Sequence, residues 1–577
     1  MGHVLEQSVA ESHQVVVEVA FRALARRLDG RAEEIPPALV EAIASAQGDR
    51  DEVLRQTEQV FQTDRPLELI LFDTDRIADY VFESSRPPVI AGASAILKGL
   101  NAEIATSYRD FVIFSGGGEG MLLAPVGQGE EICRGIEALY ARKTGNALTV
   151  TTGFVPVGPH EFISSAREET AADGVRLVSG TQAVLARLRD QVRRKKDERG
   201  SQVTEVGGGQ ERCVSCRDRA AEPGKKIRGL RPDAKVDGPL CNPCWKRWDL
   251  GRVEIAGISF EELVEAAGPE REKSKYIGFL YVDGNSMGAL FGSLASLPEI
   301  RFLSQAVREV FEELRRQVKK EVQRFAPRRS DRDLPLVSYL GGGDEAIWIL
   351  PGPLAVHVTE RLTSWIEKAS AAIAGLPPLL KAKTRVSHVT FGAGLVLCGS
   401  SYPVRYQFGL AKELQKNAKS MFYQARGGKA FSSFDFEVLT DSSPLSENLE
   451  ASRALTDRTE EPGFRRSCRP YAAEGFTALL ARMRRLRDAD VKLATSQLYA
   501  LQEGSREGRR IFLNFLRYQI ARKPAGARYQ SWLNAFGVSP ADPAAVERFF
   551  VQDLGKGSGT WIGDGLQLAP FLEWREG

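Results

Sequence analysis

The sequence predicts a multidomain α+β protein in which one domain occurs twice. In each copy an apolar run ends in an acidic residue, a glycine-rich hairpin follows, and a third apolar run comes after it. Residues 111–124 match residues 336–349 when the two hairpins are aligned without a gap. The three blocks recur in the same order, which indicates an internal repeat of one domain.

The composition is that of a globular protein, with 43% hydrophobic and 27% charged residues. A chain of 577 residues is long enough for about three to five domains. The net charge of +3 is nearly neutral, so any contact with nucleic acid would depend on local basic patches. No signal peptide and no apolar run long enough for a bilayer is apparent. Four of the seven cysteines form two close pairs, which favours a cytoplasmic location with bound metal.

We expect residues 1–66 to form a helical N-terminal segment with a break at Pro36 and Pro37. The segment contains only His3 and His13, and no adjacent His-Asp pair occurs anywhere in the chain. We therefore expect no catalytic set here.

In the second copy, residues 277–283 read as a strand that ends in Asp283 and is followed by a tight turn and a helix start. Free backbone N–H groups at such a turn can hold phosphate. The turn residues that would do so are Gly284, Asn285 and Ser286.

The hairpin at residues 336–350 ends its turn with Asp344 and Glu345, directly after Gly342 and Gly343. Together with Asp283, these acids offer three carboxylates from two neighbouring strands, enough to hold two Mg²⁺ or Mn²⁺ ions against a triphosphate. This is the layout of a palm-type nucleotidyl transferase or cyclase. The alternative is a solvated hairpin tip.

A helix-like stretch at residues 410–423 carries Lys419, which could contact phosphates or simply be a solvated charge. A longer amphipathic helix is expected over residues 303–322.

The first copy lacks part of this acidic set in the ungapped alignment. Asp73 matches Asp283 and Glu119 matches Asp344, but Gly120 takes the place of Glu345. We therefore expect the first copy to bind a nucleotide without catalysis, or to be structural. Its candidate nucleotide-binding residues are Asp73, Gly117, Gly118 and Glu119.

Two Cys-x-x-Cys pairs lie between the copies, separated by 24 residues. Cys213, Cys216, Cys241 and Cys244 therefore predict one structural, tetrahedral Zn²⁺ site. Residues 212–248 carry ten Lys or Arg against four Asp or Glu, and Trp245 and Trp248 add aromatic rings. Such a surface could bind nucleic acid by phosphate and stacking contacts, or the module could only tie the two copies together.

Residues 441–470 are polar and contain proline, which predicts a linker, and residues 471–577 read as helices with basic runs. These runs mark a solvated face, or else a face that docks RNA or protein.

Several motifs of the chain resemble those of a known family. Residues 72–84, Phe-Asp-Thr-Asp-Arg-Ile-Ala-Asp-Tyr-Val-Phe-Glu-Ser, and residues 90–97, Ile-Ala-Gly-Ala-Ser-Ala-Ile-Leu, are similar to the first palm of the large polymerase-cyclase subunit of type III CRISPR effector complexes. The cysteine pairs, the Gly-Gly-Asp-Glu hairpin and residues 496–501, Ser-Gln-Leu-Tyr-Ala-Leu, follow in that family's order.

The resemblance covers roughly residues 67–577 and implies two ferredoxin-like palm domains, a zinc-ribbon insert and a helical C-terminal domain. The expected boundaries are 67–200 for the first palm, 201–270 for the zinc module and linker, 271–440 for the catalytic palm, and 441–577 for the C-terminal domain.

The resemblance also implies a function in antiviral defence. The second palm would make cyclic oligoadenylate from ATP when a guide complex binds target RNA. The implied partners are guide RNA, target RNA and small CRISPR-associated subunits of one ribonucleoprotein, with no membrane. We further expect the two palms to hold one nucleotide each, the second activating its α-phosphate and the first presenting an acceptor.

The chain departs from the family pattern at three points. Glu345 replaces the second aspartate of a Gly-Gly-Asp-Asp turn, and Asn285 stands where an acid is common. Many members begin with a His-Asp nuclease domain, and because this chain has no such pair, DNA cleavage is not expected.

Two alternatives remain. Gly-Gly-Asp-Glu also resembles the turn of diguanylate cyclases, although Ala346 follows where those enzymes have Phe, and they use one palm per chain. The other alternative is a palm scaffold that only holds an RNA-guided complex together.

Overall fold

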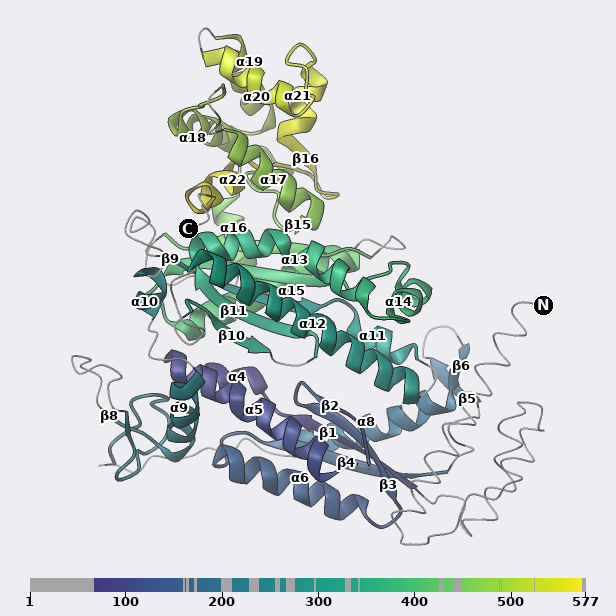
Figure 1. Cartoon of the computed structure of the whole chain (residues 1–577). Coiled ribbons are helices and arrows are strands. Elements are labelled where there is room, and N and C mark those ends of the chain that lie inside the picture. Colours follow the sequence, from purple (N-terminus) through teal and green to yellow (C-terminus); the bar gives the residue numbers. More distant parts are fainter. Residues whose placement is uncertain are drawn as a thin grey trace. The chain divides into compact units, whose positions relative to one another are not determined.

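The computed structural model describes most of the chain after residue 66 (Figure 1). The expected N-terminal helical segment, residues 1–66, lies outside the described residues. Within the described part, no helix combines the length and apolar character needed to cross a membrane. The described residues are 67–109, 111–158, 161, 165–170, 174–198, 210–227, 238–254, 260–265, 276–294, 297–326, 334–340, 343–424, 430–440, 449–486, 488, 490–522 and 525–572.

The described residues form two compact units. The first contains residues up to 254 together with 286–309 and 340–344, and the second contains the remaining residues.

The first repeat is a four-stranded antiparallel sheet with the strand order β2-β3-β1-β4. Its β-α-β-β-α-β order along the chain is that of a ferredoxin-like domain. The central strand β1 is apolar throughout its first six positions except Glu68, and these positions are buried, as expected for a strand covered on both faces. The elements are β1 (Leu67–Thr74), α4 (Ile77–Phe82), α5 (Pro87–Ser107), β2 (Val112–Gly116), β3 (Glu119–Pro125), α6 (Gly129–Thr144) and β4 (Val150–Val157).

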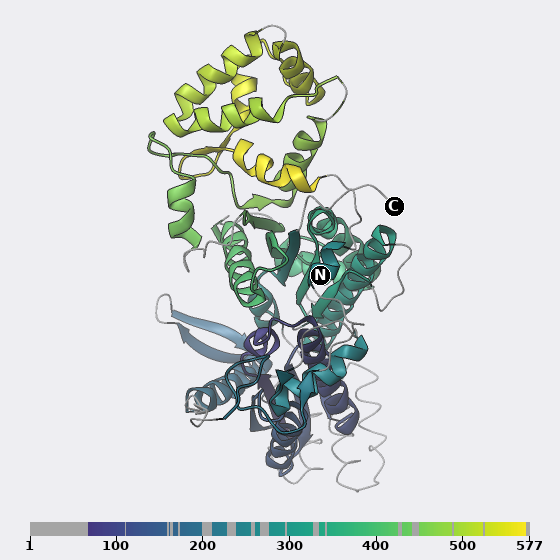
Figure 2. The ribbon, with the colours of Figure 1, turned by 90° about the vertical axis from the view of Figure 1, so that its left-hand side faces the viewer.

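After β4 the chain forms the hairpin of β5 (Ser165–Thr170) and β6 (Gly174–Ser179), which projects from the sheet of the first repeat (Figure 2). Helix α8 (Gly180–Glu198) then returns along β4, where a Cβ on Gly153 would lie 2.9 Å from a side-chain atom of Val192.

The cysteine module consists of the short pair β7 (Lys226–Ile227) and β8 (Gly238–Pro239), followed by α9 (Asn242–Glu254). Helix α9 crosses α5 at backbone contact. A Cβ on Gly92 would lie 1.7 Å from the Arg247 carbonyl oxygen, and one on Gly251 would lie 1.6 Å from that of Pro88. These two glycines therefore join the module to the first repeat within one unit.

The second repeat has the same core order, β10-β11-β9-β12, within a six-stranded sheet that continues with β13 and β15. The internal repeat predicted from the sequence is thus confirmed in the topology, and the expected helix at 303–322 is confirmed as part of α12. The elements are α10 (Phe260–Glu265), β9 (Tyr276–Gly284), α11 (Met287–Gly292), α12 (Leu297–Phe325), β10 (Val337–Leu340), β11 (Glu345–Pro351), α13 (Gly352–Ala372), α14 (Leu376–Thr384), β12 (Phe391–Gly399), α15 (Val404–Gln424) and β13 (Ser433–Val438).

Strand register corrects the ungapped alignment of the two hairpins. Asp73 of β1 lies opposite Glu119 of β3, and Asp283 of β9 lies opposite Glu345 of β11. Glu119 is therefore the counterpart of Glu345, not of Asp344. In this register Gly118, directly before Glu119, takes the place of Asp344, so the first repeat has no acid at that position.

The C-terminal region differs from the expected linker and all-helical domain. Residues 449–470 contain a helix and a strand, three short strands form a sheet in the order β14-β17-β16, and β15 joins the sheet of the second repeat. The elements are α16 (Leu449–Thr456), β14 (Phe464–Arg465), β15 (Tyr471–Ala472), α17 (Ala473–Arg485), α18 (Thr495–Gly504), η2 (Ser505–Glu507), α19 (Arg509–Ala521), α20 (Ala525–Ala535), α21 (Pro543–Phe550), β16 (Val551–Asp553), β17 (Ser558–Thr560), α22 (Ile562–Leu568) and η3 (Ala569–Phe571).

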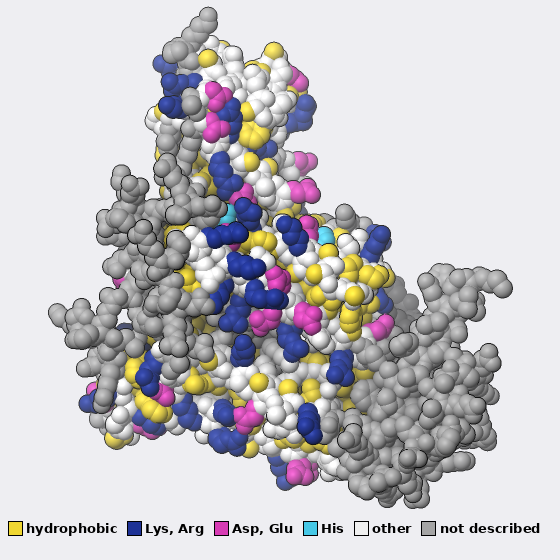
Figure 3. All heavy atoms as spheres, in the orientation of Figure 1, with side chains coloured by type: hydrophobic (Ala, Val, Ile, Leu, Met, Phe, Trp, Pro, Cys, Tyr) yellow, Lys and Arg dark blue, Asp and Glu magenta, His cyan; other side chains and the backbone are white. Residues whose placement is uncertain are grey.

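On the face shown in Figure 3, basic side chains are interspersed with acidic ones rather than gathered into one broad basic field. This mixture agrees with the nearly neutral net charge of +3.

Candidate functional site

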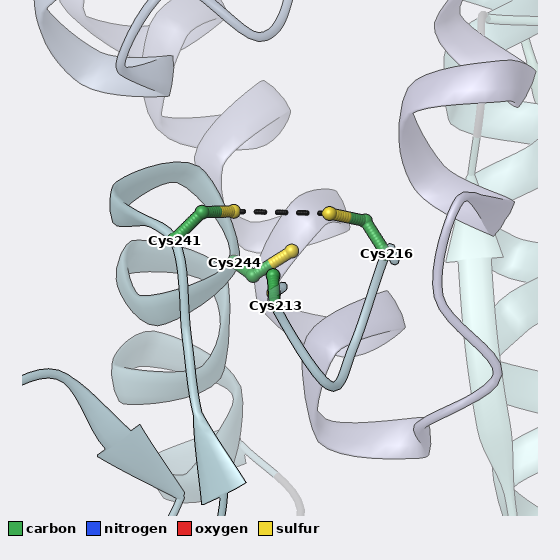
Figure 4. Close-up of side chains that lie close together, drawn as sticks. All are labelled: Cys213, Cys216, Cys241 and Cys244. Carbon is green, nitrogen blue, oxygen red and sulfur yellow. Dashed lines mark hydrogen bonds between the residues drawn. The ribbon is translucent and has the colours of Figure 1, made fainter. Parts of the chain in front are cut away.

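The four cysteines predicted to bind zinc come together in the first unit. All four are buried, and their sulfur atoms lie within 4.8 Å of one another (Figure 4). The Sγ atoms of Cys216 and Cys241 are 3.9 Å apart. Tetrahedral zinc with Zn–S bonds of about 2.3 Å requires sulfur atoms about 3.8 Å apart. The cluster therefore fits a structural Zn²⁺ with four thiolate ligands.

Hydrogen bonds among the four thiols lower the pKa of Cys213 and raise that of Cys244. The four sulfurs therefore cannot all ionise together unless a cation balances their charge.

Arg247 links this cluster to the first repeat, a role that the sequence did not reveal. Its guanidinium is fully buried and donates to the Tyr80 carbonyl, to Glu83, and to Cys244 Sγ at 3.1 Å. It also lies over the Tyr80 ring, 4.7 Å from the centroid.

Arg247 and Trp248 are both buried, so neither belongs to an exposed basic and aromatic surface. The described contacts join the module to the first repeat.

The second repeat brings two of the predicted catalytic acids side by side. Asp283 at the end of β9 lies opposite Glu345 at the start of β11, and opposite Gly392 of β12 on its other side. The Tyr281 hydroxyl donates to Glu345 Oε1 at 2.6 Å. Burial raises the pKa of Glu345, this hydrogen bond opposes the rise, and the charge of Asp283 adds to it.

Lys419 lies at this end of the sheet and contacts protein groups. Its Nζ is 2.7 Å from Asp283 Oδ2 and 2.6 Å from the Gly284 carbonyl oxygen. Helix α15 comes this close because β12 has glycines beneath it. A Cβ on Gly392 would lie 2.6 Å from Lys419 Cγ, and one on Gly394 would lie 2.2 Å from the Ala411 carbonyl oxygen.

The turn after β9 is held by Asn285, which is buried. Its backbone N–H donates to the Thr390 carbonyl at 2.8 Å and its Nδ2 to the Phe431 carbonyl at 3.1 Å. Its Oδ1 is buried and accepts no hydrogen bond from the described residues. Ser286 follows in the left-handed conformation with φ 54°, immediately before α11.

Gly343 and Asp344 occupy the turn before β11 and are partly exposed, whereas Gly342 lies outside the described residues.

The oxygen-bearing side chains at this end of the sheet are of the type that binds hard cations. Carboxylate and amide oxygens, such as those of Asp283, Glu345 and Asn285, are the ligands that Mg²⁺ prefers. Among the described residues, however, the cysteine cluster is the only set of three or more potential ligands within 4.8 Å of one another.

The first repeat has its own acidic strand end, and there a lysine bridges two acids. Lys196 of α8 is 2.6 Å from Asp73 Oδ2 and 3.0 Å from Asp75 Oδ1. Burial alone would lower the pKa of Lys196, but the ion pairs with both aspartates outweigh it and raise the pKa. Asp75 also accepts from the Thr151 hydroxyl at 3.0 Å. In the sequence Lys196 ends a basic run, Arg-Arg-Lys-Lys at 193–196, which gives no sign of these contacts.

Glu119 lies opposite Asp73, and its side chain is exposed. Gly117 and Gly118 form the tight turn with φ of 69° and 84°, and the Gly118 carbonyl accepts from the Thr74 hydroxyl at 2.6 Å.

The chain matches no protein-family model and no curated protein. Among solved structures it is similar to a crystal structure of Csm1 in T. onnurineus, at 14% identity over 88% of this chain and 70% of that one, with a TM-score of 0.53. It is also similar to a Csm1–Csm4 cassette in complex with AMPPNP (16% identity, 90% and 73% coverage, TM-score 0.50) and to the apo cassette (15%, 88% and 70%, 0.50). The chain therefore has the fold of Csm1, which confirms at the level of the fold the resemblance found in the sequence.

Proposed function

We propose that this chain is the large subunit of a type III CRISPR effector complex and that its second repeat is a palm domain that makes cyclic oligoadenylate from ATP. The observation that carries the proposal is the pairing of Asp283 with Glu345 at the same sheet end as Lys419, in a chain with the Csm1 fold. Csm1–Csm4 cassettes have been solved with one ATP and with cA3, both at a TM-score of 0.50 to this chain.

In the proposed reaction a ribose hydroxyl of one nucleotide attacks the α-phosphorus of the next. The hydroxyl releases its proton to water, a new P–O bond forms, the bond between the α-phosphorus and the leaving oxygen breaks, and pyrophosphate departs. Mg²⁺ or Mn²⁺ held by Asp283, Asp344 and Glu345 would supply positive charge against the phosphates. The backbone at Gly284, Asn285 and Ser286, with Gly342 and Gly343, would approach the phosphates.

The chain's own side chains have separate tasks in this proposal. Glu345 must be ionised to bind a cation, and the Tyr281 hydroxyl favours that form. Lys419 neutralises Asp283 until a substrate phosphate offers its Nζ a new partner.

We propose unequal roles for the two repeats. Each binds one nucleotide, but in the first repeat Lys196 already neutralises Asp73 and Asp75, and Gly118 takes the place of Asp344. The first repeat then holds an acceptor nucleotide through Asp73, Gly117, Gly118 and Glu119 without activating it.

The complex would contain guide RNA, target RNA and small CRISPR-associated subunits, with target RNA switching on synthesis. Because the sequence has no adjacent His-Asp pair, the proposal includes no DNA cleavage by this chain. The diguanylate-cyclase alternative is less favoured because one chain already contains two repeats of the fold.

The test is incubation of the assembled complex with ATP and Mg²⁺, with and without target RNA, followed by mass analysis of the products. Cyclic oligoadenylate should appear only with target RNA, and Asp344→Asn should abolish it, since losing a metal ligand costs orders of magnitude in rate. A complex that assembles but makes no product would instead favour the scaffold alternative.

Glu345→Gln and Glu119→Gln change the same register position in the two repeats and form a matched pair. The first should abolish synthesis, whereas the second should slow it only in part. Equal and complete losses would refute the unequal roles.

A further inference from the structure

A second charged site lies in the C-terminal region and is formed by residues that come after both acidic strand ends in the sequence. A pocket of about 720 Å³ is formed by the end of α16, residues 457–469, the end of α18 with η2, and the start of α22. This volume is in the range of small-molecule sites. Its lining includes four arginines: Arg458, Arg466, Arg469 and Arg506.

One of these arginines is fully satisfied by protein groups. The Arg469 side chain is 2% exposed and pairs with Asp564 at 3.1 Å and Asp457 at 3.5 Å. Asp564 also accepts from the Ser467 hydroxyl and the Cys468 backbone N–H, both at 2.8 Å. This part of the lining is a closed ionic network and has no free charge for a ligand.

Arg466 is different, because it is nearly buried and poorly satisfied. Its side chain is 11% exposed, and its Nε is buried with no hydrogen-bond partner among the described residues. Its terminal nitrogens reach only the Thr456 carbonyl at 3.5 Å, and the Gln502 carbonyl and Glu503 carboxylate at 3.4 Å. These distances are at the limit of a hydrogen bond, whereas buried donors are normally well partnered. Burial, together with the nearby Arg506 charge, lowers the pKa of Arg466.

Glu503 is the ion-pair partner of Arg466 in the described chain, and a ligand could readily displace it. It is 57% exposed and shared with Arg506, 3.1 Å away. Exposed ion pairs contribute little stability, so one such carboxylate balances two guanidinium groups only weakly. A phosphate group carries more charge and matches the planar donor fork of arginine.

We propose that this pocket binds a small phosphate-bearing molecule of nucleotide size, with Arg466 and Arg506 holding the phosphate and the amides of Gln502 and Gln567 facing the remainder. A small molecule is favoured over a nucleic-acid strand because the arginines surround one hollow with a nearly buried guanidinium. Tracking a strand needs a row of exposed basic side chains.

The test measures binding of AMP and of inorganic phosphate to the full-length chain by calorimetry, with EDTA present to suppress metal-dependent binding at the acidic strand ends. Arg466→Gln should weaken AMP binding about tenfold or more, because a charge-assisted hydrogen bond is lost. Inorganic phosphate should compete with AMP. Arg485→Gln is the matched control, since Arg485 pairs with Asp488 at 2.7 Å and does not line the pocket.

Glu503→Gln guards against a loss caused only by misfolding. It removes the competing carboxylate and should tighten phosphate binding several-fold, a gain that a misfolded protein would not show. Asp283→Asn should leave AMP binding under these conditions unchanged, which separates the pocket from the proposed palm. The proposal would be overturned if Arg466→Gln bound AMP as tightly as the wild type, or if the wild type did not bind AMP. It would also be overturned if an RNA oligonucleotide without a terminal phosphate bound in place of AMP.

Discussion

Replacing Tyr281 with Phe removes one hydroxyl from the acidic end of β9 and β11 while keeping the ring. The ring should stay in place because it packs edge-on against Phe408, with centroids 6.0 Å apart. The hydroxyl donates to Glu345 Oε1 at 2.6 Å, and this bond favours the ionised carboxylate. The substitution therefore changes the proton affinity of Glu345 with little change in packing.

The size of the effect follows from the hydrogen bond. A bond to a charged group contributes about 1.5–3 kcal/mol, and about 1.4 kcal/mol corresponds to one pKa unit. Burial already raises the pKa of Glu345 above its ordinary value of 4.5. Tyr281→Phe should raise it further, because the bond that favours the ionised carboxylate is lost.

The sign of the pH dependence follows from this direction. Because folding raises the pKa of Glu345, proton binding stabilises the folded chain below pH 4.5, and this contribution is lost as the pH rises through the folded pKa. Cation binding has the opposite preference, since it requires the ionised form. Activity should therefore fall on the acid side at a pH above 4.5, and in Tyr281→Phe this fall should occur at a higher pH than in the wild type.

The assay is the rate of ATP conversion by the assembled complex between pH 5 and 9, together with Mn²⁺ affinity measured by electron paramagnetic resonance over the same range. Tyr406→Phe is the control, because its side chain is 63% exposed on α15. If the rate and the Mn²⁺ affinity both fell at the same acidic pH in Tyr281→Phe and in the wild type, Glu345 would not be the titrating ligand.

Three further predictions concern the parts around the acidic strand ends. Lys196→Met should free Asp73 and Asp75 for a divalent cation, so the chain should bind one more Mn²⁺ than wild type, and unchanged stoichiometry would contradict this. Arg247→Met should leave Glu83 with one cation fewer and cost about 3–5 kcal/mol, seen as a lower melting temperature and faster zinc loss to a chelator. Gly394→Ala should push α15 from β12 and cost about 1–3 kcal/mol, whereas Gly409→Ala, in open space, should not destabilise the chain.

The repeat could be predicted from the sequence because each strand, acid and glycine turn is a local pattern. The register could not. Matching glycines pulled the two hairpins into an ungapped alignment, which set Glu119 against Asp344. Only the pairing of β1 with β3 and of β9 with β11 sets Glu119 beside Glu345. The same shift also aligns Pro125 with Pro351, the last residues of β3 and β11.

Contacts between residues far apart in the sequence could not be predicted either. Arg247 reads as one of ten basic residues in a charged stretch, yet it is buried against Glu83, 164 positions earlier. Lys196 lies 123 positions from Asp73. Strand β15 could not be predicted from the sequence, because two residues are too few to show an alternating pattern and the segment before them reads as a linker.

The difference between the two repeats depends on how each lysine is anchored as well as on the number of acids. In both, a helix that follows the fourth core strand brings a lysine to the strand-end aspartate: Lys196 in the first and Lys419 in the second. Asp75 gives Lys196 a second carboxylate, whereas the corresponding position of the second repeat is Asn285, which cannot pair with a cation by charge. Lys419 is consequently held by one carboxylate and a carbonyl, and a cation or phosphate has less to displace there. Asn285, which departs from the family pattern, is thus the residue that leaves Lys419 with a single carboxylate partner.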